Sequence, residues 1–237
     1  MNGLKYRYSE RKRRISDYLS NFEILRLRLR MTKRIHAALI VIIFFLNISF
    51  IVPASFADQF VIDPVYTTFM FRIKHLMGYA SGTIPKYDGT IDLNQDNKAF
   101  VGMNITLDLA SMDTKNKDRD EDLRSERFFD VAKFPQGKFV TKKVQADDKV
   151  IGDLTLKGVT KEVTLAYVFH GIAKDQFGRT KTALTLKGTI NRKDFGISYN
   201  TKTDDGKWLL GDDVDLWIEI QGILDKDKDI KRTDVRN

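Results

Sequence analysis

Apolar and polar residues alternate with a period of two over most of residues 58–224. Such alternation predicts β-strands that bury one face. In the clearest run, residues 67–76, one face carries Phe69, Phe71, Ile73 and His75. The later positions that we expect to face inward are Val101, Met103, Ile105, Leu107, Leu109, Leu154, Leu156, Val163, Leu165, Tyr167, Phe169, Leu184, Leu186, Ile190, Val214, Leu216, Ile218 and Ile220.

One segment departs from this alternation and predicts a helical insert near residues 115–133. Asn116 is placed to cap a helix, and acidic residues crowd the first turns, where the helix dipole favours negative charge. Asp120 and Arg124 are four residues apart, a spacing that predicts an ion pair. The insert has too few apolar residues to build a core, so we expect it to rest on the strands as a lid or plug.

The predicted fold class is all-β, an extended antiparallel β-barrel of about eight strands with this one helical insert. The strands after the insert are long, several exceeding eight residues, and long up-and-down strands favour a barrel over a sandwich. Four glycines interrupt the strands, namely Gly82, Gly102, Gly152 and Gly188. They mark either barrel bends and bulges or places where a ligand approaches the backbone.

Residues 1–57 are predicted to be a basic leader that ends in a secretory signal peptide. Met31, a possible true start, precedes a basic pair, an apolar run over 37–52 and the small residues Ser55 and Ala57. This order predicts export with cleavage after Ala57, and the alternative is a retained membrane anchor. Residues 58–224 would then form one domain that does not span the membrane, followed by a charged tail, 225–237.

The net charge of +8 belongs to the leader. Residues 1–57 hold 11 of the 40 lysines and arginines and 3 of the 32 acidic residues, which leaves 29 of each sign in the remainder. A neutral mature chain gives no support to a nucleic-acid partner. The chain has no cysteine, which excludes disulfides, a thiol nucleophile and a lipid-modified cysteine.

Several motifs occur in an order and spacing that resemble the YceI-like family of polyisoprenoid-binding proteins. They include Ala110-Ser111-x-x-Thr114, Arg119-Asp120-x-x-Leu123, Phe128-Phe129-Asp130-Val131-x-x-Phe134-Pro135 and Asn191-Arg192-x-Asp194-Phe195-Gly196. Two positions depart, because Asp122 stands where we expect a histidine, and Tyr66-Thr67 where we expect His-Ser. The resemblance implies a lipocalin-like periplasmic barrel whose apolar tunnel takes an isoprenoid lipid, such as a polyprenyl quinone or polyprenyl phosphate.

The residues predicted to contact such a ligand are Phe69, Phe71, Ile73, His75, Met103, Ile105, Leu165, Tyr167, Phe169, Leu186, Gly188 and Arg192. His75 would bond a head group, or it is a structural histidine bonded to a backbone carbonyl. Arg192 would contact the ligand, or it forms a buried ion pair with Asp194. Arg119 and Asp120 would likewise pin the insert to the barrel.

No catalytic or metal-binding constellation is recognisable in the sequence. His170 is predicted on the outer face, and the aspartates from Asp225 lack the glycine and glutamate of a calcium loop, which are replaced by Ile230 and Arg236. The predicted function is therefore a non-catalytic carrier with no cofactor other than its bound lipid. An enzyme acting on such a lipid and an interaction protein with a filled barrel remain as alternatives. Trp217 is predicted on the outer face, where it would be covered by the insert or by the partner in a homodimer.

Overall fold

The structure is a computed structural model that describes residues 57–94 and 96–230. The described residues all belong to one compact unit. The predicted leader and most of the predicted tail therefore lie outside the described residues. No helix among the described residues is long and apolar enough to cross a membrane.

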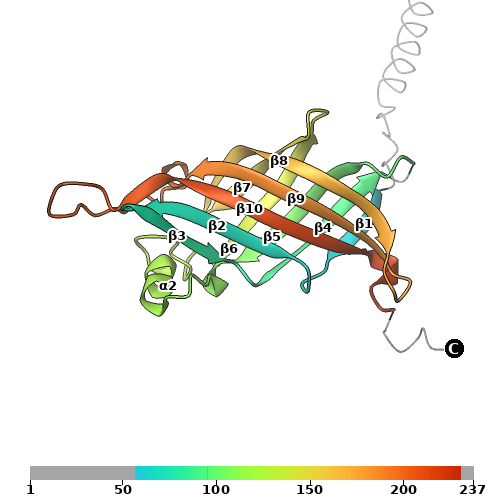
Figure 1. Cartoon of the computed structure of the whole chain (residues 1–237), viewed down its shortest axis with the longest axis horizontal. Coiled ribbons are helices and arrows are strands. Elements are labelled where there is room, and N and C mark those ends of the chain that lie inside the picture. The colour runs from blue at the N-terminus through green and yellow to red at the C-terminus, as the bar shows by residue number, and fades with distance from the viewer. Residues whose placement is uncertain (1–56, 95, 231–237) are drawn as a thin grey trace, which may run out of the picture. The chain divides into compact units, whose positions relative to one another are not determined.

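Ten strands account for most of the described residues (Figure 1). The strands are β1 (Ala57–Ile62), β2 (Thr68–His75), β3 (Gly78–Thr83), β4 (Tyr87–Asn94), β5 (Phe100–Asp108), β6 (Gln136–Val144), β7 (Lys149–Leu156), β8 (Val159–Lys174), β9 (Thr180–Asn191) and β10 (Leu210–Leu224). The helical elements are α2 (Lys117–Arg124) and the short 3-10 turns η1 (Leu109–Ser111), η2 (Arg192–Phe195) and η3 (Asp225–Asp227).

The strands pair antiparallel in the order β1-β4-β5-β6-β7-β8-β9-β10, and β10 pairs back to β1. These eight strands close an all-β barrel, as the sequence predicts. Strand β10 is long enough to have two neighbours on one edge, with β1 opposite Gly222 and β2 opposite Ile218. Because β3 pairs with β2, the hairpin of β2 and β3 extends the sheet along the half of β10 that β1 does not reach.

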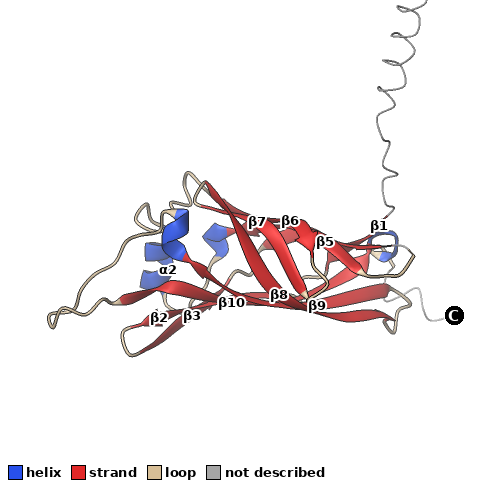
Figure 2. Cartoon of the chain, turned by 90° about the horizontal axis from the view of Figure 1, so that it is seen from above, coloured by secondary structure: helices blue, strands red, loops and turns tan. Residues whose placement is uncertain are grey.

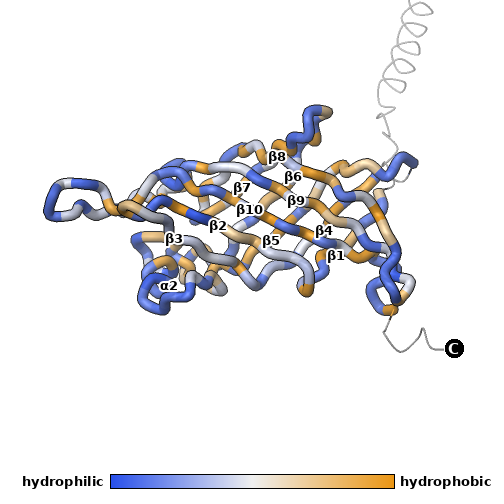
Figure 3. Tube along the Cα trace, viewed as in Figure 1, coloured by the Kyte–Doolittle hydropathy of each residue, from blue (hydrophilic) through white to orange (hydrophobic). Residues whose placement is uncertain are grey.

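The predicted alternation holds along β2, where Phe69 is buried and Met70 is exposed. Figure 3 shows apolar and polar residues alternating along the strands and polar residues dominating the loops. The prediction fails at Val101, which is 42% exposed. A register shift pairs Asp92 with Gly102 but Leu93 with Phe100, so Val101 is the extra residue of a β-bulge and turns outward.

The helical insert is shorter than predicted, because only residues 117–124 are α-helical and the chain then continues in turns. Asn116 caps the helix as expected, and its side chain accepts a hydrogen bond from the Arg119 N–H. The predicted ion pair between Asp120 and Arg124 does not form. Asp120 is buried and accepts hydrogen bonds from Thr114 instead.

The insert reaches the hydrophobic core through its aromatic residues. Phe128 is 7% exposed, and Leu123, Phe129 and Val131 pack against the same core. In both Figure 1 and Figure 2 this insert lies at one end of the barrel, the same end as the turn between β2 and β3 and the loop before β10. This arrangement agrees with the expectation that the insert is anchored on the barrel and does not form a core of its own.

Candidate functional site

A cavity of about 360 Å³ lies inside the barrel, and its walls are almost entirely apolar. Lining side chains from the strands and the insert include Phe69, Phe71, Ile73, Met103, Ile105, Phe129, Phe139, Leu154, Leu165, Val214, Leu216, Ile218 and Ile220. Along β10 the lining runs from Leu210 to Ile220, a length of about 30 Å at the usual rise of a strand. The cavity therefore has the proportions of a tunnel.

The polar groups that line the cavity lie together at the end that carries the insert. They are His75, Thr114, Arg119, Asp122, Arg192, Tyr199 and Thr201. They come from the end of β2, from the insert and the residue before it, and from η2 with the segment that follows it, which Figures 1 and 2 place at the same end. We call this end the mouth. A polar mouth with an apolar interior suits a ligand that has a long apolar body and a polar head.

Eight of the predicted contact residues line the cavity: Phe69, Phe71, Ile73, His75, Met103, Ile105, Leu165 and Arg192. Tyr167, Phe169, Leu186 and Gly188 do not. The ring of Tyr167 packs on Phe100, at 5.1 Å between centroids, and Leu186 is fully buried. These residues face inward as predicted, but their surroundings are filled by other side chains, so they do not reach the free volume.

His75 is half-buried at the mouth, at the last position of β2. Its imidazole has no hydrogen-bond partner among the described residues, so the structural alternative, a ring bonded to a backbone carbonyl, is not found. The ring borders the cavity. Its N–H and its ring acceptor are therefore available to a group that enters the mouth.

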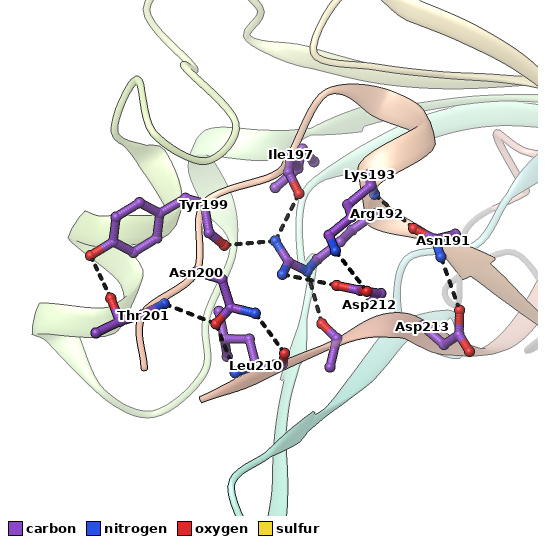
Figure 4. Close-up of polar contacts among 11 residues, drawn as sticks. Asn191, Arg192, Lys193, Ile197, Tyr199, Asn200, Thr201, Leu210, Asp212 and Asp213 are labelled. Atoms are coloured by element: carbon purple, nitrogen blue, oxygen red, sulfur yellow. Dashed lines mark hydrogen bonds and ion pairs between the residues drawn. The ribbon is translucent and has the colours of Figure 1, made fainter. Parts of the chain in front are cut away.

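Arg192 is only 4% exposed, and its guanidinium is used internally (Figure 4). It donates to the carbonyl oxygens of Gly211 at 2.8 Å, Ile197 at 2.8 Å and Tyr199 at 2.7 Å. Its carboxylate partner is Asp212, at 3.3 Å, and not the predicted Asp194. Burial lowers the pKa of Arg192, which the Asp212 carboxylate opposes.

These bonds give Arg192 a structural task at the mouth. They fix the segment after η2 against the start of β10, and Asn200 adds bonds to both backbone groups of Leu210 (Figure 4). Asp212 also bonds Lys193 at 2.8 Å, and this contact is the main reason why the pKa of its carboxyl is lowered. Because most of its donors are engaged, Arg192 shapes the wall and has little left to offer a ligand.

Arg119 and Asp120 do not form the predicted ion pair with each other, and both bond Thr114 instead, next to Asp113, which bridges to Thr83 at the end of β3. Arg119 donates to the Thr114 hydroxyl and carbonyl, both at 2.8 Å. Asp120 accepts from the Thr114 N–H at 2.8 Å and from its hydroxyl at 2.6 Å. Thr114 and Asp120 are both buried, so this network is shielded from water and strongly constrains the insert.

A family model described as the YceI-like domain matches residues 60–222, which run from β1 into β10. The chain belongs to the YceI-like family. Protein YceI of an Escherichia coli strain is 39% identical over 161 residues, which cover 66% of this chain and 81% of that protein. A UPF0312 protein of Staphylococcus epidermidis is 36% identical over 158 residues, which cover 66% of this chain and 92% of that protein.

Two solved structures are similar to the barrel of this chain. The Campylobacter jejuni YCEI protein matches with a TM-score of 0.55 and 33% identity, over 63% of this chain and 88% of that chain. A polyisoprenoid binding domain from Saccharophagus degradans matches with a TM-score of 0.51 and 11% identity, over 71% of this chain and 99% of that chain. At so low an identity the second likeness concerns the fold alone.

Asp122, which departs from the pattern we expect of the YceI-like family, belongs to a cluster at the mouth. It forms an ion pair with Arg127, and Arg127 also lies 4.7 Å from the ring centre of Tyr199. Tyr199 accepts from Arg127 at 3.2 Å and from Thr201 at 3.1 Å. The cluster joins the insert to a segment 72 residues away, and its three cavity-lining members, Asp122, Tyr199 and Thr201, are absent from the predicted site.

Three of the four strand glycines make room for side chains of the cavity wall. A Cβ on Gly82 would lie 2.6 Å from the ring of Phe71, and one on Gly152 would lie 2.4 Å from the ring of Phe139. At Gly188 the nearest atom is Leu165 Cδ2, at 2.5 Å. Each of these side chains lies over a glycine and lines the cavity, whereas Gly102 sits at the β-bulge.

The remaining sequence predictions concern the outer surface. His170 is exposed there as expected, and its ring lies 2.8 Å from the Thr185 hydroxyl. Trp217 is 44% exposed on the outer wall, where Lys187 lies 3.7 Å from its ring centre. The predicted homodimer, which would cover this side chain, stays a prediction. No group of residues suited to a metal ion occurs within the described part of the chain.

Proposed function

We propose that the barrel holds a long-chain isoprenoid lipid, with its tail in the cavity and its head group at the mouth. The observation that carries this proposal is the separation of an apolar tunnel from a cluster of polar groups at one end. The name of the Saccharophagus degradans protein, a polyisoprenoid binding domain, adds support from the same fold. A polyprenyl quinone and a polyprenyl phosphate are both candidates for the ligand.

The energetics favour a tail-dominated mode of binding. Burial contributes about 25 cal/mol for each Å² of apolar surface, so a tail of several isoprene units can supply most of the affinity. The free volume of about 360 Å³ lies near the lower end of the range of about 300–1,000 Å³ that is common for ligand pockets, so it is small for a long tail. Flexible wall residues such as Met103 and Met112 would have to move, or part of the tail would stay outside the mouth.

The proposed location of this carrier rests on the signal peptide predicted in residues 1–57. We propose export to the periplasm with cleavage after Ala57, which would leave a mature chain that begins one residue into β1. The mass of the exported protein tests this directly. A species that keeps residues 37–52 and stays in the membrane fraction would identify the segment as an anchor instead.

Lipid binding is tested by extracting the purified mature protein with organic solvent and identifying the extract by mass spectrometry. We expect an isoprenoid lipid to be recovered, and the emptied protein to take up an added polyprenyl quinone. A barrel that is empty and takes up no such lipid contradicts the proposal. Chemical conversion of the added lipid would identify an enzyme instead of a carrier.

A further inference from the structure

Two loops project at the mouth and expose large apolar side chains to water. The turn between β2 and β3 presents Leu76 and Met77, which are 39% and 95% exposed, and the loop before β10 presents Trp208, which is 60% exposed. We call Leu76, Met77 and Trp208 the mouth patch. Figures 1 and 2 place both loops at the end of the barrel that carries α2.

The two loops form one continuous surface. The Leu76 N–H donates to the Leu209 carbonyl at 2.8 Å, and Leu76 holds a left-handed backbone with φ of 54°. A shallow groove of about 510 Å³ runs between the loops and includes all three patch residues in its lining. Leu210 lines both this groove and the barrel cavity. The mouth patch is therefore continuous with the entrance of the tunnel.

Lysines surround the mouth patch. Lys74 and Lys207 line the groove, and Lys202 Nζ lies 4.8 Å from the ring centre of Trp208. Asp204 and Asp205 are the acidic residues of the same loop, and Asp205 pairs with Lys207 at 2.8 Å. With three lysines and two aspartates, the surroundings carry a small positive charge. An apolar tip with basic residues beside it is suited to an anionic lipid surface.

We propose that the mouth patch docks on the surface of a lipid bilayer by inserting Met77 and Trp208 among the head groups. Tryptophan favours this interface, because its ring is apolar while its N–H still finds polar partners. The lysines would face the phosphates of anionic lipids. Docking in this orientation places the tunnel entrance against the membrane, so that an apolar ligand passes between bilayer and barrel without crossing water.

The chain has two tryptophans, which makes a matched fluorescence experiment possible. Trp217→Phe leaves Trp208 in the mouth patch as the sole reporter, and Trp208→Phe leaves Trp217 on the outer wall. The protein used is the chain from Asp58, since the compact unit has its own core. The probes are vesicles of phosphatidylcholine, with and without phosphatidylglycerol, and the same vesicles made with brominated lipid.

Vesicles that contain phosphatidylglycerol should shift the Trp208 emission to the blue, and brominated lipid should quench it, while Trp217 changes little. Met77→Ser combined with Trp208→Ser should weaken vesicle partitioning about tenfold or more, because two inserted apolar side chains are lost. Val65→Ser is the matched control. It removes an apolar side chain that is 76% exposed, from the loop before β2 and thus away from the mouth.

The proposal is overturned if the Trp208 emission does not shift with any of the vesicles. It is also overturned if Val65→Ser weakens vesicle partitioning as much as the double variant does. A Trp208 shift that appears on raising the protein concentration without vesicles would identify a second copy of the chain as the occupant, and would also overturn it. Uptake of a polyprenyl quinone from detergent micelles is measured separately. Retained uptake without vesicle binding refutes docking alone, whereas vesicle binding without uptake refutes the proposed carrier function.

Discussion

The two halves of β10 have the same alternating sequence but very different surroundings. Toward its start, Val214, Leu216 and Ile218 are half-buried and line the cavity. Toward its end, Ile220 forms the floor of the cavity at 1% exposure, and Leu224 is buried outside the cavity lining. The change occurs where the neighbour of β10 changes from β2 to β1.

Since the alternation is the same in both halves, it cannot explain why only one half borders the cavity. The cavity depends on which strand lies beside β10 and on where glycines make room for large side chains. We call the half in which β10 pairs with β1 the closed half. There the Cβ of Phe60, in β1, lies 2.8 Å from the position that a Cβ on Gly222 would take. That glycine admits a side chain that fills the barrel. We call the half that borders the cavity the open half. There Gly152 and Gly188 make room for Phe139 and Leu165, so these wall side chains lie close to the backbone and space remains between them.

The largest expected effect tests whether the closed half supplies most of the stability. Leu93→Ala, at a fully buried site in β4, should lower the free energy of unfolding by about 3–5 kcal/mol. Leu216→Ala removes the same atoms from the cavity wall and should cost about 1–2 kcal/mol, since its side chain already borders free volume. Urea unfolding of both variants measures the difference. Equal losses would mean that the two halves are packed alike.

A second prediction concerns a single substitution that blocks the cavity in the open half. Gly188→Leu should drive Leu165 into the tunnel and abolish uptake of a polyprenyl quinone while the barrel still folds. Gly102→Ala is the control, because its new Cβ would meet Thr141 at an ordinary 3.4 Å. Uptake is measured by titration, and circular dichroism checks the fold. Normal uptake by a folded Gly188→Leu would show that Leu165 can move aside.

The sequence could predict the barrel because alternation at Phe69, Phe71 and Ile73 reports directly which face of a strand is buried. Alternation could not locate the bulge that turns Val101 outward, since a bulge depends on the register with β4. It could not separate filled from hollow regions either. Leu186 and Leu216 look alike in the sequence, yet one is fully buried and the other lines the cavity.

The mouth was harder to predict because its contacts join distant segments. The sequence suggests Asp194 as the partner of Arg192, since it is two residues away, but the fold brings Asp212 there from β10. Tyr199 is held at the mouth by its contacts with Arg127, and no local sequence pattern indicates these contacts. The departure at Asp122 was the one signal in the sequence that pointed to an altered mouth.

A third prediction concerns how the open half is held together. Arg192→Met should destabilise the protein by about 2–3 kcal/mol, because the buried carbonyl of Ile197 and the partly buried carbonyl of Gly211 lose their donor. Arg72→Met is the control, since Arg72 forms an exposed ion pair with Asp215, and such pairs contribute about 0–1 kcal/mol. Urea unfolding compares the two variants. A loss at Arg192 as small as that at Arg72 would show that its bonds are dispensable.

The smallest expected effect tests whether the mouth selects the ligand or holds it. His75→Ala removes the free imidazole at the mouth and should weaken binding of a polyprenyl quinone by no more than about tenfold, because one hydrogen bond nets only about 0.5–1.5 kcal/mol. Phe71→Ala, four residues earlier on the same face of β2, removes apolar contact with the tail and should weaken binding more.

The measurement is the affinity of each variant for one quinone and for one polyprenyl phosphate, with circular dichroism to confirm folding. We expect His75→Ala to change the ratio of the two affinities more than it changes their mean. A His75→Ala protein that binds neither lipid, beside a folded Phe71→Ala protein that binds both normally, would reverse the assignment. The mouth would then supply the affinity, and the apolar tunnel would only accommodate the tail.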